Sequence, residues 1–118
     1  MRRRDWHLRV ADMVDAAETA MSLTNGLEKA EFLADRTLVD ASIKNLSVLG
    51  EAAAHIPDEI IHQWPDVPWR MMRDMRNLII HEYFGVNPDI VWGTINDDLP
   101  VVLAELGQLV ERGGSEQG

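Results

Sequence analysis

The 118-residue chain has no cysteine, so neither a disulfide framework nor a thiolate metal site can form within it. It also has no apolar run close to the roughly 20 residues that a membrane-spanning helix needs. The basic first residues are not followed by the apolar stretch that a secretory signal requires. These absences predict a protein outside the membrane and in the cytoplasm, because a chain without cysteine fits a reducing compartment.

Basic residues are scarce as well, with 11 Lys and Arg against 20 Asp and Glu and a formal net charge of -9. This balance argues against broad coating of nucleic acid, which relies on many contacts between basic side chains and phosphates. Three arginines nevertheless cluster at Arg70, Arg73 and Arg76. A small basic focus on an acidic body favours a selective anion site. The alternative is that these arginines pair with nearby acids such as Asp66 and Asp74.

Strand-like alternation of apolar and polar residues is missing, and helical periodicity takes its place. Apolar positions recur at steps of three and four residues, and glycines and prolines interrupt the pattern. The predicted helices cover approximately residues 6–23, 28–33, 35–55, 58–63, 68–84 and 88–112. The sequence therefore predicts an all-α fold, an antiparallel bundle of about four to six helices. It forms one domain over residues 1–112, followed by a flexible C-terminal tail over residues 113–118.

Local signals set the ends of these helices. Asn87 precedes a proline and an acid, which is typical of a helix start with a capping side chain. Gly85 is expected to end the preceding helix in a left-handed conformation. Pro100 lies inside the last predicted helix and should kink or split it.

An octet within the fifth predicted helix carries the chemistry that the rest of the chain lacks. It begins at Arg76, contains Asn77 and His81, and ends at Tyr83, the only tyrosine in the chain. Metal-independent cleavage of RNA by its own 2′-hydroxyl needs a base, an acid and positive charge beside the phosphate. Histidine exchanges protons near neutral pH, and the planar fork of arginine binds phosphate oxygens. The octet is therefore a candidate site for cleaving a phosphodiester.

Helix geometry limits what one copy of the octet can do. Arg76 and His81 are five residues apart, so their side chains diverge by about 140° on an ideal helix. A two-fold dimer would let both copies of each residue line one cleft. Asn77 shares a face with His81 and could orient its imidazole or hold substrate, and Tyr83 could contact the phosphate or carry a modification. The alternative is a surface histidine and a packing tyrosine at a polar helix end.

Beyond spacing, the chain resembles the HEPN superfamily, and most closely the HepT-like toxins of MNT–HEPN toxin–antitoxin pairs. Arg76, His81 and Tyr83 match the Arg-x4-His-x-Tyr signature of that family. The neighbouring segments are also similar and follow in the same order: Asn45-Leu46, Leu49-Gly50-Glu51-Ala52, Val67-Pro68-Trp69-Arg70, Val91-Trp92 and Asp98-Leu99-Pro100. The likeness covers nearly the whole chain before the tail.

The resemblance implies the toxin of a type VII-like module, a metal-independent endoribonuclease that works as a homodimer with its site at the dimer interface. It implies Arg76 and His81 as catalytic residues. The charge and spacing arguments add Arg73, Asn77 and Tyr83 as residues that hold or orient RNA. The resemblance also implies a partner, an MNT-type nucleotidyltransferase antitoxin that AMPylates Tyr83, and neither a cofactor nor a metal. The alternative is a non-catalytic helical partner, or a nucleotide-binding subunit, of a nucleotidyltransferase.

Three further predictions concern side chains outside the octet. Glu51 lies in an apolar stretch, where an unpaired acid would be costly, so it is expected to meet Arg76 or Arg73 and to support them. A metal site at His55 and His62, with Glu51, Asp58 and Glu59 nearby, is disfavoured because the spacing of Glu51 and His55 does not match the Glu-x2-His of di-iron bundles. Trp69 is expected in the core or in a dimer contact, with base stacking as the alternative.

Overall fold

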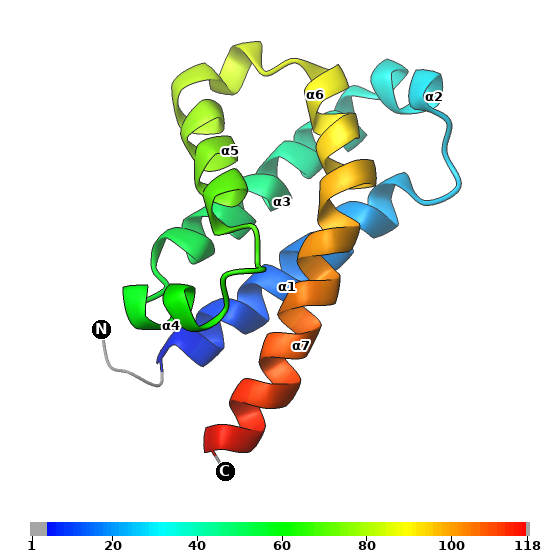
Figure 1. Cartoon of the computed structure of the whole chain (residues 1–118). Helices are drawn as coiled ribbons and strands as arrows, with labels where there is room; N and C mark the ends of the chain where they lie inside the picture. The colour runs from blue at the N-terminus through cyan, green and yellow to red at the C-terminus, as the bar shows by residue number, and fades with distance from the viewer. Residues whose placement is uncertain (1–4, 118) are drawn as a thin grey trace.

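The computed structural model describes residues 5–117 of the chain, with side chains described for residues 5–112. In that part of the chain there are helices and no strands (Figure 1). The elements are α1 (Asp5–Thr24), α2 (Lys29–Ala34), α3 (Arg36–Ala54), α4 (Asp58–Gln63), α5 (Trp69–Glu82), the 3-10 turn η1 (Tyr83–Gly85), α6 (Pro88–Gly93), the π-helical turn η2 (Thr94–Asp98) and α7 (Leu99–Gln117). The predicted all-α class is confirmed.

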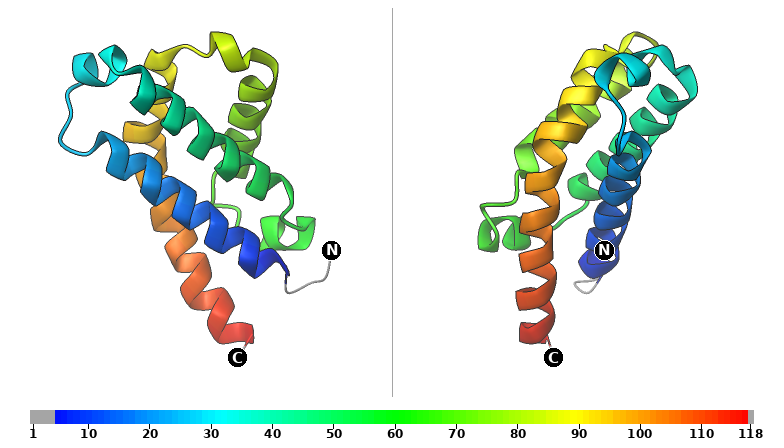
Figure 2. Two further views of the ribbon diagram at one scale, coloured as in Figure 1. Left: turned by 180° about the vertical axis from the view of Figure 1, so that it is seen from behind. Right: turned by 90° about the vertical axis from the view of Figure 1, so that its right-hand side faces the viewer.

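The long helices pack as an antiparallel bundle around α3. Figure 2 shows α1 and α3 side by side and running in opposite directions, and α5 returns along the other side of α3. α6, η2 and α7 follow one another in a continuous column that lies against α1 (Figure 1). If the continuous segment α6–η2–α7 is counted as one helix, the described helices number six, which is within the predicted range of four to six.

Helix ends follow the capping signals, with one exception. The side chain of Asn87 accepts a hydrogen bond from the backbone N–H of Asp89 at 2.9 Å, as the start signal predicted. Asp35 caps α3 in the same way, with its carboxylate 3.1 Å from the N–H of Leu38. The prediction for Gly85 is wrong, because Gly26 (φ 80°) is the only described glycine with positive φ. A right-handed 3-10 turn ends the α5 segment instead.

Pro100 acts on the helix through the turn that precedes it. Proline has no N–H to donate, and its ring clashes with the carbonyl of the residue four positions earlier in a regular helix. The chain relieves this clash by widening to a π-helical turn, in which the N–H of Leu99 bonds to the carbonyl of Thr94. The proline thus divides the predicted last helix into α6 and α7 without breaking the column.

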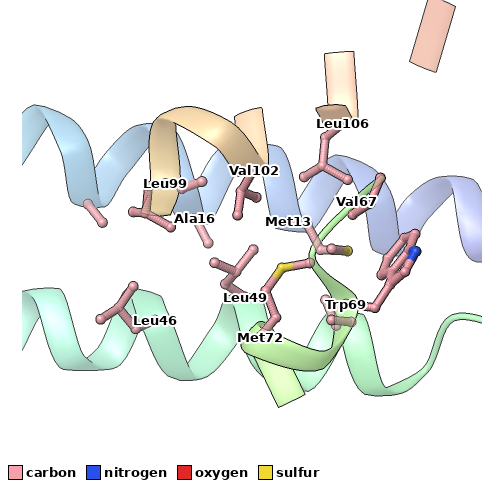
Figure 3. Close-up of a cluster of buried hydrophobic side chains, with 14 of the residues drawn as sticks. Met13, Ala16, Leu46, Leu49, Val67, Trp69, Met72, Leu99, Val102 and Leu106 are labelled. Carbon is pink, nitrogen blue, oxygen red and sulfur yellow. The ribbon is translucent and has the colours of Figure 1, made fainter. Parts of the chain in front are cut away.

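The core lies where α1, α3, α5 and α7 converge. Figure 3 shows Met13, Leu49, Met72 and Val102 directed toward one another from these four helices, and all four are fully buried. Trp69 belongs to this core, because only 5% of it is exposed and its indole N–H donates to the carbonyl of Trp64 at 2.9 Å. The core alternative is therefore confirmed for Trp69, and its ring is not available for base stacking.

The sequence also predicted where the helical domain ends and that no helix spans a membrane. α7 continues to Gln117, beyond the domain boundary predicted at residue 112. The side chains of the predicted tail, residues 113–118, lie outside the described part, so its flexibility stays a prediction. Among the described helices, none combines the length and the apolar character needed to cross a membrane.

Candidate active site

The octet lies on the C-terminal half of α5 and on the turn η1. Trp69, Met72 and Ile79 are buried and hold one face of α5 against the core. Because α5 packs directly on α3, that contact fixes which side chains of the octet face the bundle and which face outward. Arg76 lies at the edge of the buried face, and His81 occupies the last turn of the helix.

Gly50 determines how closely α3 and α5 approach. A Cβ placed on Gly50 would lie 2.5 Å from the Cβ of Arg76 and 2.9 Å from the backbone oxygen of Met72. Both distances are shorter than side-chain atoms tolerate, so only glycine allows this crossing. The absence of a side chain at Gly50 therefore places Arg76 directly against α3.

Replacing Gly50 with alanine is expected to destabilise the fold by about 1–3 kcal/mol, because the extra methyl group must push α3 and α5 apart. Gly107 on α7 is the matched control, since a Cβ there meets no atom within 4 Å. Gly107→Ala is expected to stabilise the protein by about 0.5–1 kcal/mol through helix propensity. Urea unfolding of both variants measures the difference, and equal effects of the two substitutions would contradict the close crossing.

The close crossing brings Arg76 to Glu51. The Nε of Arg76 donates to Oε2 of Glu51 at 2.6 Å, which joins α5 to α3. This hydrogen bond, together with the charge of the guanidinium, lowers the pKa of the Glu51 carboxyl from its ordinary value. The predicted partner is the one observed, but Glu51 is not buried, because 48% of its side chain is exposed.

Other groups surround this pair. The Nη1 of Arg76 donates to Oδ1 of Asn77 at 3.4 Å, so Asn77 contacts the arginine in this structure. On the other side of Glu51, the Nδ1 of His55 lies 2.9 Å from the Glu51 carbonyl oxygen and 3.8 Å from Oε1. Arg9 on α1 is close enough to add to the lowering of the Glu51 pKa. Within the part of the chain that the structure describes, no three His, Asp or Glu side chains are grouped to hold a metal ion.

His81 and the remaining arginines face outward. His81 is exposed, and it makes no hydrogen bond or ion pair among those of residues 5–112. Arg70 lies 3.9 Å from Asp74, one turn along α5, so the alternative of acid pairing holds for this arginine, but loosely. Arg73 is half-buried beside Arg70 on the same helix.

Tyr83 lies on η1, just beyond the end of α5. Half of its surface is exposed, and its ring meets the ring of Phe84 edge-on at 5.3 Å. Both residues line a groove of about 550 Å³ that lies between the start of α3 and residues 83–88. The hydroxyl-bearing residue of the octet is therefore accessible to a second molecule.

The structure brings some of the predicted site residues together and keeps others apart. Arg76, Asn77 and Glu51 form one connected group. Because α5 stays helical from Trp69 to Glu82, His81 points about 140° away from Arg76 within a single chain. Sequence reasoning missed Gly50 as the residue that positions Arg76, although its signal was a glycine beside an acid in an apolar helix stretch.

Comparison with known proteins gives consistent matches over this region. A family model described as "Ribonuclease HepT-like" matches residues 13–109, which include every predicted site residue. A protein of Thermococcus cleftensis named "Probable ribonuclease HepT" is 34% identical over 98 residues, which cover 83% of this chain and 89% of that protein. A protein of Methanocaldococcus jannaschii named "Putative RNase MJ0127" is 31% identical over 111 residues, which cover 94% of this chain and 92% of that protein. No solved structure matches the chain significantly.

Proposed function

The chain belongs to the HepT-like ribonuclease family, and on that premise we propose that it is a metal-independent endoribonuclease that acts as the toxin of a type VII-like toxin–antitoxin module. Its substrate is RNA in the cytoplasm, and its catalytic residues are Arg76 and His81. The observation that carries the proposal is the 2.6 Å contact between Arg76 and Glu51. It fixes the arginine of an Arg-x4-His octet at a partly open position, with 29% of its side chain exposed.

The chemistry follows from what each group can hold or move. The 2′-hydroxyl oxygen of one nucleotide forms a bond to phosphorus, and the bond from phosphorus to the 5′-oxygen breaks. His81 carries one of the two proton transfers, by taking the proton that leaves the 2′-hydroxyl or by giving the one that the 5′-oxygen gains, and solvent water carries the other. The products are a 2′,3′-cyclic phosphate and a 5′-hydroxyl.

Arg76 supplies the positive charge for this reaction. Its Nε is held by Glu51, and its Nη1 makes only a long contact with Asn77. The terminal nitrogens therefore remain available to bind the phosphoryl oxygens, where the negative charge increases in the transition state. Glu51 is a positioning residue in this scheme, since it acts through Arg76.

A homodimer completes the site in this proposal. A single α5 cannot direct Arg76 and His81 at one phosphate, whereas two copies related by a two-fold axis can share a cleft. Exposed apolar side chains near the octet supply contact surface for the second copy, namely Leu78, Ile80 and Phe84. Phe84 is 94% exposed, although its ring meets that of Tyr83, so most of this large apolar side chain is free to contact a second copy.

Control of the toxin is assigned to an MNT-type nucleotidyltransferase that attaches AMP to Tyr83. The exposed ring of Tyr83 is accessible to such an enzyme. The added phosphate would bring negative charge to the end of the arginine-bearing helix and compete with RNA.

The class of reaction is tested with the purified wild-type protein, produced without the nucleotidyltransferase and incubated in EDTA. It is expected to cleave single-stranded RNA and to leave 2′,3′-cyclic phosphate ends. The matched control is the same RNA with 2′-O-methyl groups, which lacks the attacking hydroxyl and should stay intact. Failure to cleave the unmodified RNA would contradict the proposal and favour a non-catalytic partner of a nucleotidyltransferase.

A further inference from the structure

An open hollow of about 520 Å³ lies where the chain passes from α4 into α5. Its walls are mainly apolar and include the half-buried Ile61 and Met71, and the exposed His62 lines it as well. Two arginines, Arg70 and Arg73, also line it. The buried core residues Val67 and Trp69 form part of its wall, but Arg70 and Arg73 at its edge belong neither to the core nor to the Arg76–Glu51 pair. The combination of an apolar wall and two guanidinium groups requires its own explanation.

The hollow and the proposed active site both use side chains of α5. On an ideal helix, taking Arg76 as the origin, Arg73 lies at about 60°, Asn77 at about 100°, Arg70 at about 120° and His81 at about 140°. The sector between the two catalytic residues therefore holds Arg70, Arg73 and Asn77, together with the exposed apolar Ile80 at about 40°. This sector extends from His81 at the C-terminal end of α5 to Arg70 at the edge of the hollow.

Charge identifies the kind of molecule that this surface suits. The chain has a net charge of -9, yet Arg70 and Arg73 lie within one turn of each other at the edge of the hollow. Arg70 is 95% exposed, and its ion pair with Asp74 is long at 3.9 Å. Exposed ion pairs of this kind are weak, so a phosphate, which accepts two hydrogen bonds from one guanidinium, can displace the carboxylate.

We propose that the hollow between α4 and α5 is a nucleotide subsite for single-stranded RNA. The base of a nucleotide flanking the cleaved linkage lies against the apolar wall and the imidazole of His62, and Arg70 and Arg73 bind the adjoining phosphates. This inference rests on the proposed function, whose substrate path it extends from Arg76 toward the start of α5. Apolar contact and imidazole stacking to an unstacked base, with arginines on the backbone, are typical of single-strand recognition.

The test measures binding separately from cleavage. In the full-length His81→Ala protein, the affinity for a short fluorescent single-stranded RNA is measured by anisotropy over a range of salt concentrations. Arg70→Ala and Arg73→Ala are each expected to reduce the slope of log K against log salt by about 0.7, the loss of one phosphate contact. Arg36→Ala on α3 makes the same change in net charge and is the control, because Arg36 does not line the hollow; it should leave the slope unchanged.

The base contact is tested with RNAs that lack one base at successive positions. Binding is expected to weaken about tenfold at one position, and His62→Ala should reduce that loss. Unchanged slopes in both arginine variants would overturn the subsite while leaving the proposed function intact if the wild-type protein still cleaves RNA. Reduced slopes without any position sensitive to base removal would overturn the base contact. Absence of both RNA binding and wild-type cleavage would reject the proposed function itself.

Discussion

Replacing His81 with alanine is expected to lower the rate of RNA cleavage by about 10²–10⁴-fold, the usual contribution of a general acid or base. The variant should fold normally, because His81 is exposed and makes no hydrogen bond or ion pair among those of residues 5–112. Cleavage of labelled RNA under single-turnover conditions measures the loss. RNA affinity should change little, since the imidazole transfers protons and does not bind the phosphate.

His7→Ala is the matched control for this substitution. His7 is a half-buried histidine on α1 that stacks on Trp6, so it lies outside the octet. Its removal should leave the cleavage rate close to that of the wild-type protein. The pH profile adds a second readout, because the limb that reports the imidazole should disappear in the His81→Ala protein. An equal rate for the wild-type and His81→Ala proteins would remove His81 from the mechanism.

The sequence predicted the fold because local signals and the hydrophobic period agree along most of the chain. Asn87 and Asp35 cap helices where polar side chains precede apolar stripes. Two details have physical causes that one local pattern cannot show, namely the wrong prediction for Gly85 and the way in which Pro100 divides the last helix as expected. Gly85 lies in a right-handed turn because the chain continues into a 3-10 turn, and the Pro100 clash is absorbed by the π-helical turn before it. Both outcomes depend on how neighbouring turns share the distortion.

The sequence predicts the residues of the candidate site but not their arrangement. The octet and its Arg-x4-His spacing predict which groups carry the chemistry, which stays a prediction, and Glu51 was expected to meet an arginine. Which arginine it meets depends on the crossing of α3 and α5, and that crossing depends on the missing side chain of Gly50. Glu51 and Arg76 are 25 positions apart in the chain, so helical periodicity alone cannot pair them.

Arg76→Ala is expected to lower RNA cleavage by about 10²–10³-fold, because it removes the donor that stabilises charge on the phosphoryl oxygens in the transition state. Arg76→Lys should recover only part of this loss, since an ammonium group cannot bind Glu51 and a phosphate through one planar fork. Arg70→Ala, on the same helix, is the matched control. It should affect the rate at saturating RNA far less than Arg76→Ala does.

The contact between Glu51 and Arg76 can be tested with a double variant. If Glu51 acts only through Arg76, the Glu51→Gln, Arg76→Ala double variant should be no slower than Arg76→Ala alone, while Glu51→Gln by itself should be measurably slower than wild type. The pKa of Glu51 is lowered in the folded protein, so the stabilisation from the ion pair is present at neutral pH and is lost as the pH falls through that lowered pKa. The thermal stability of the wild-type protein should therefore fall more on acidification than that of Glu51→Gln. Additive losses in the double variant, or identical pH profiles of stability, would show that Glu51 and Arg76 work independently.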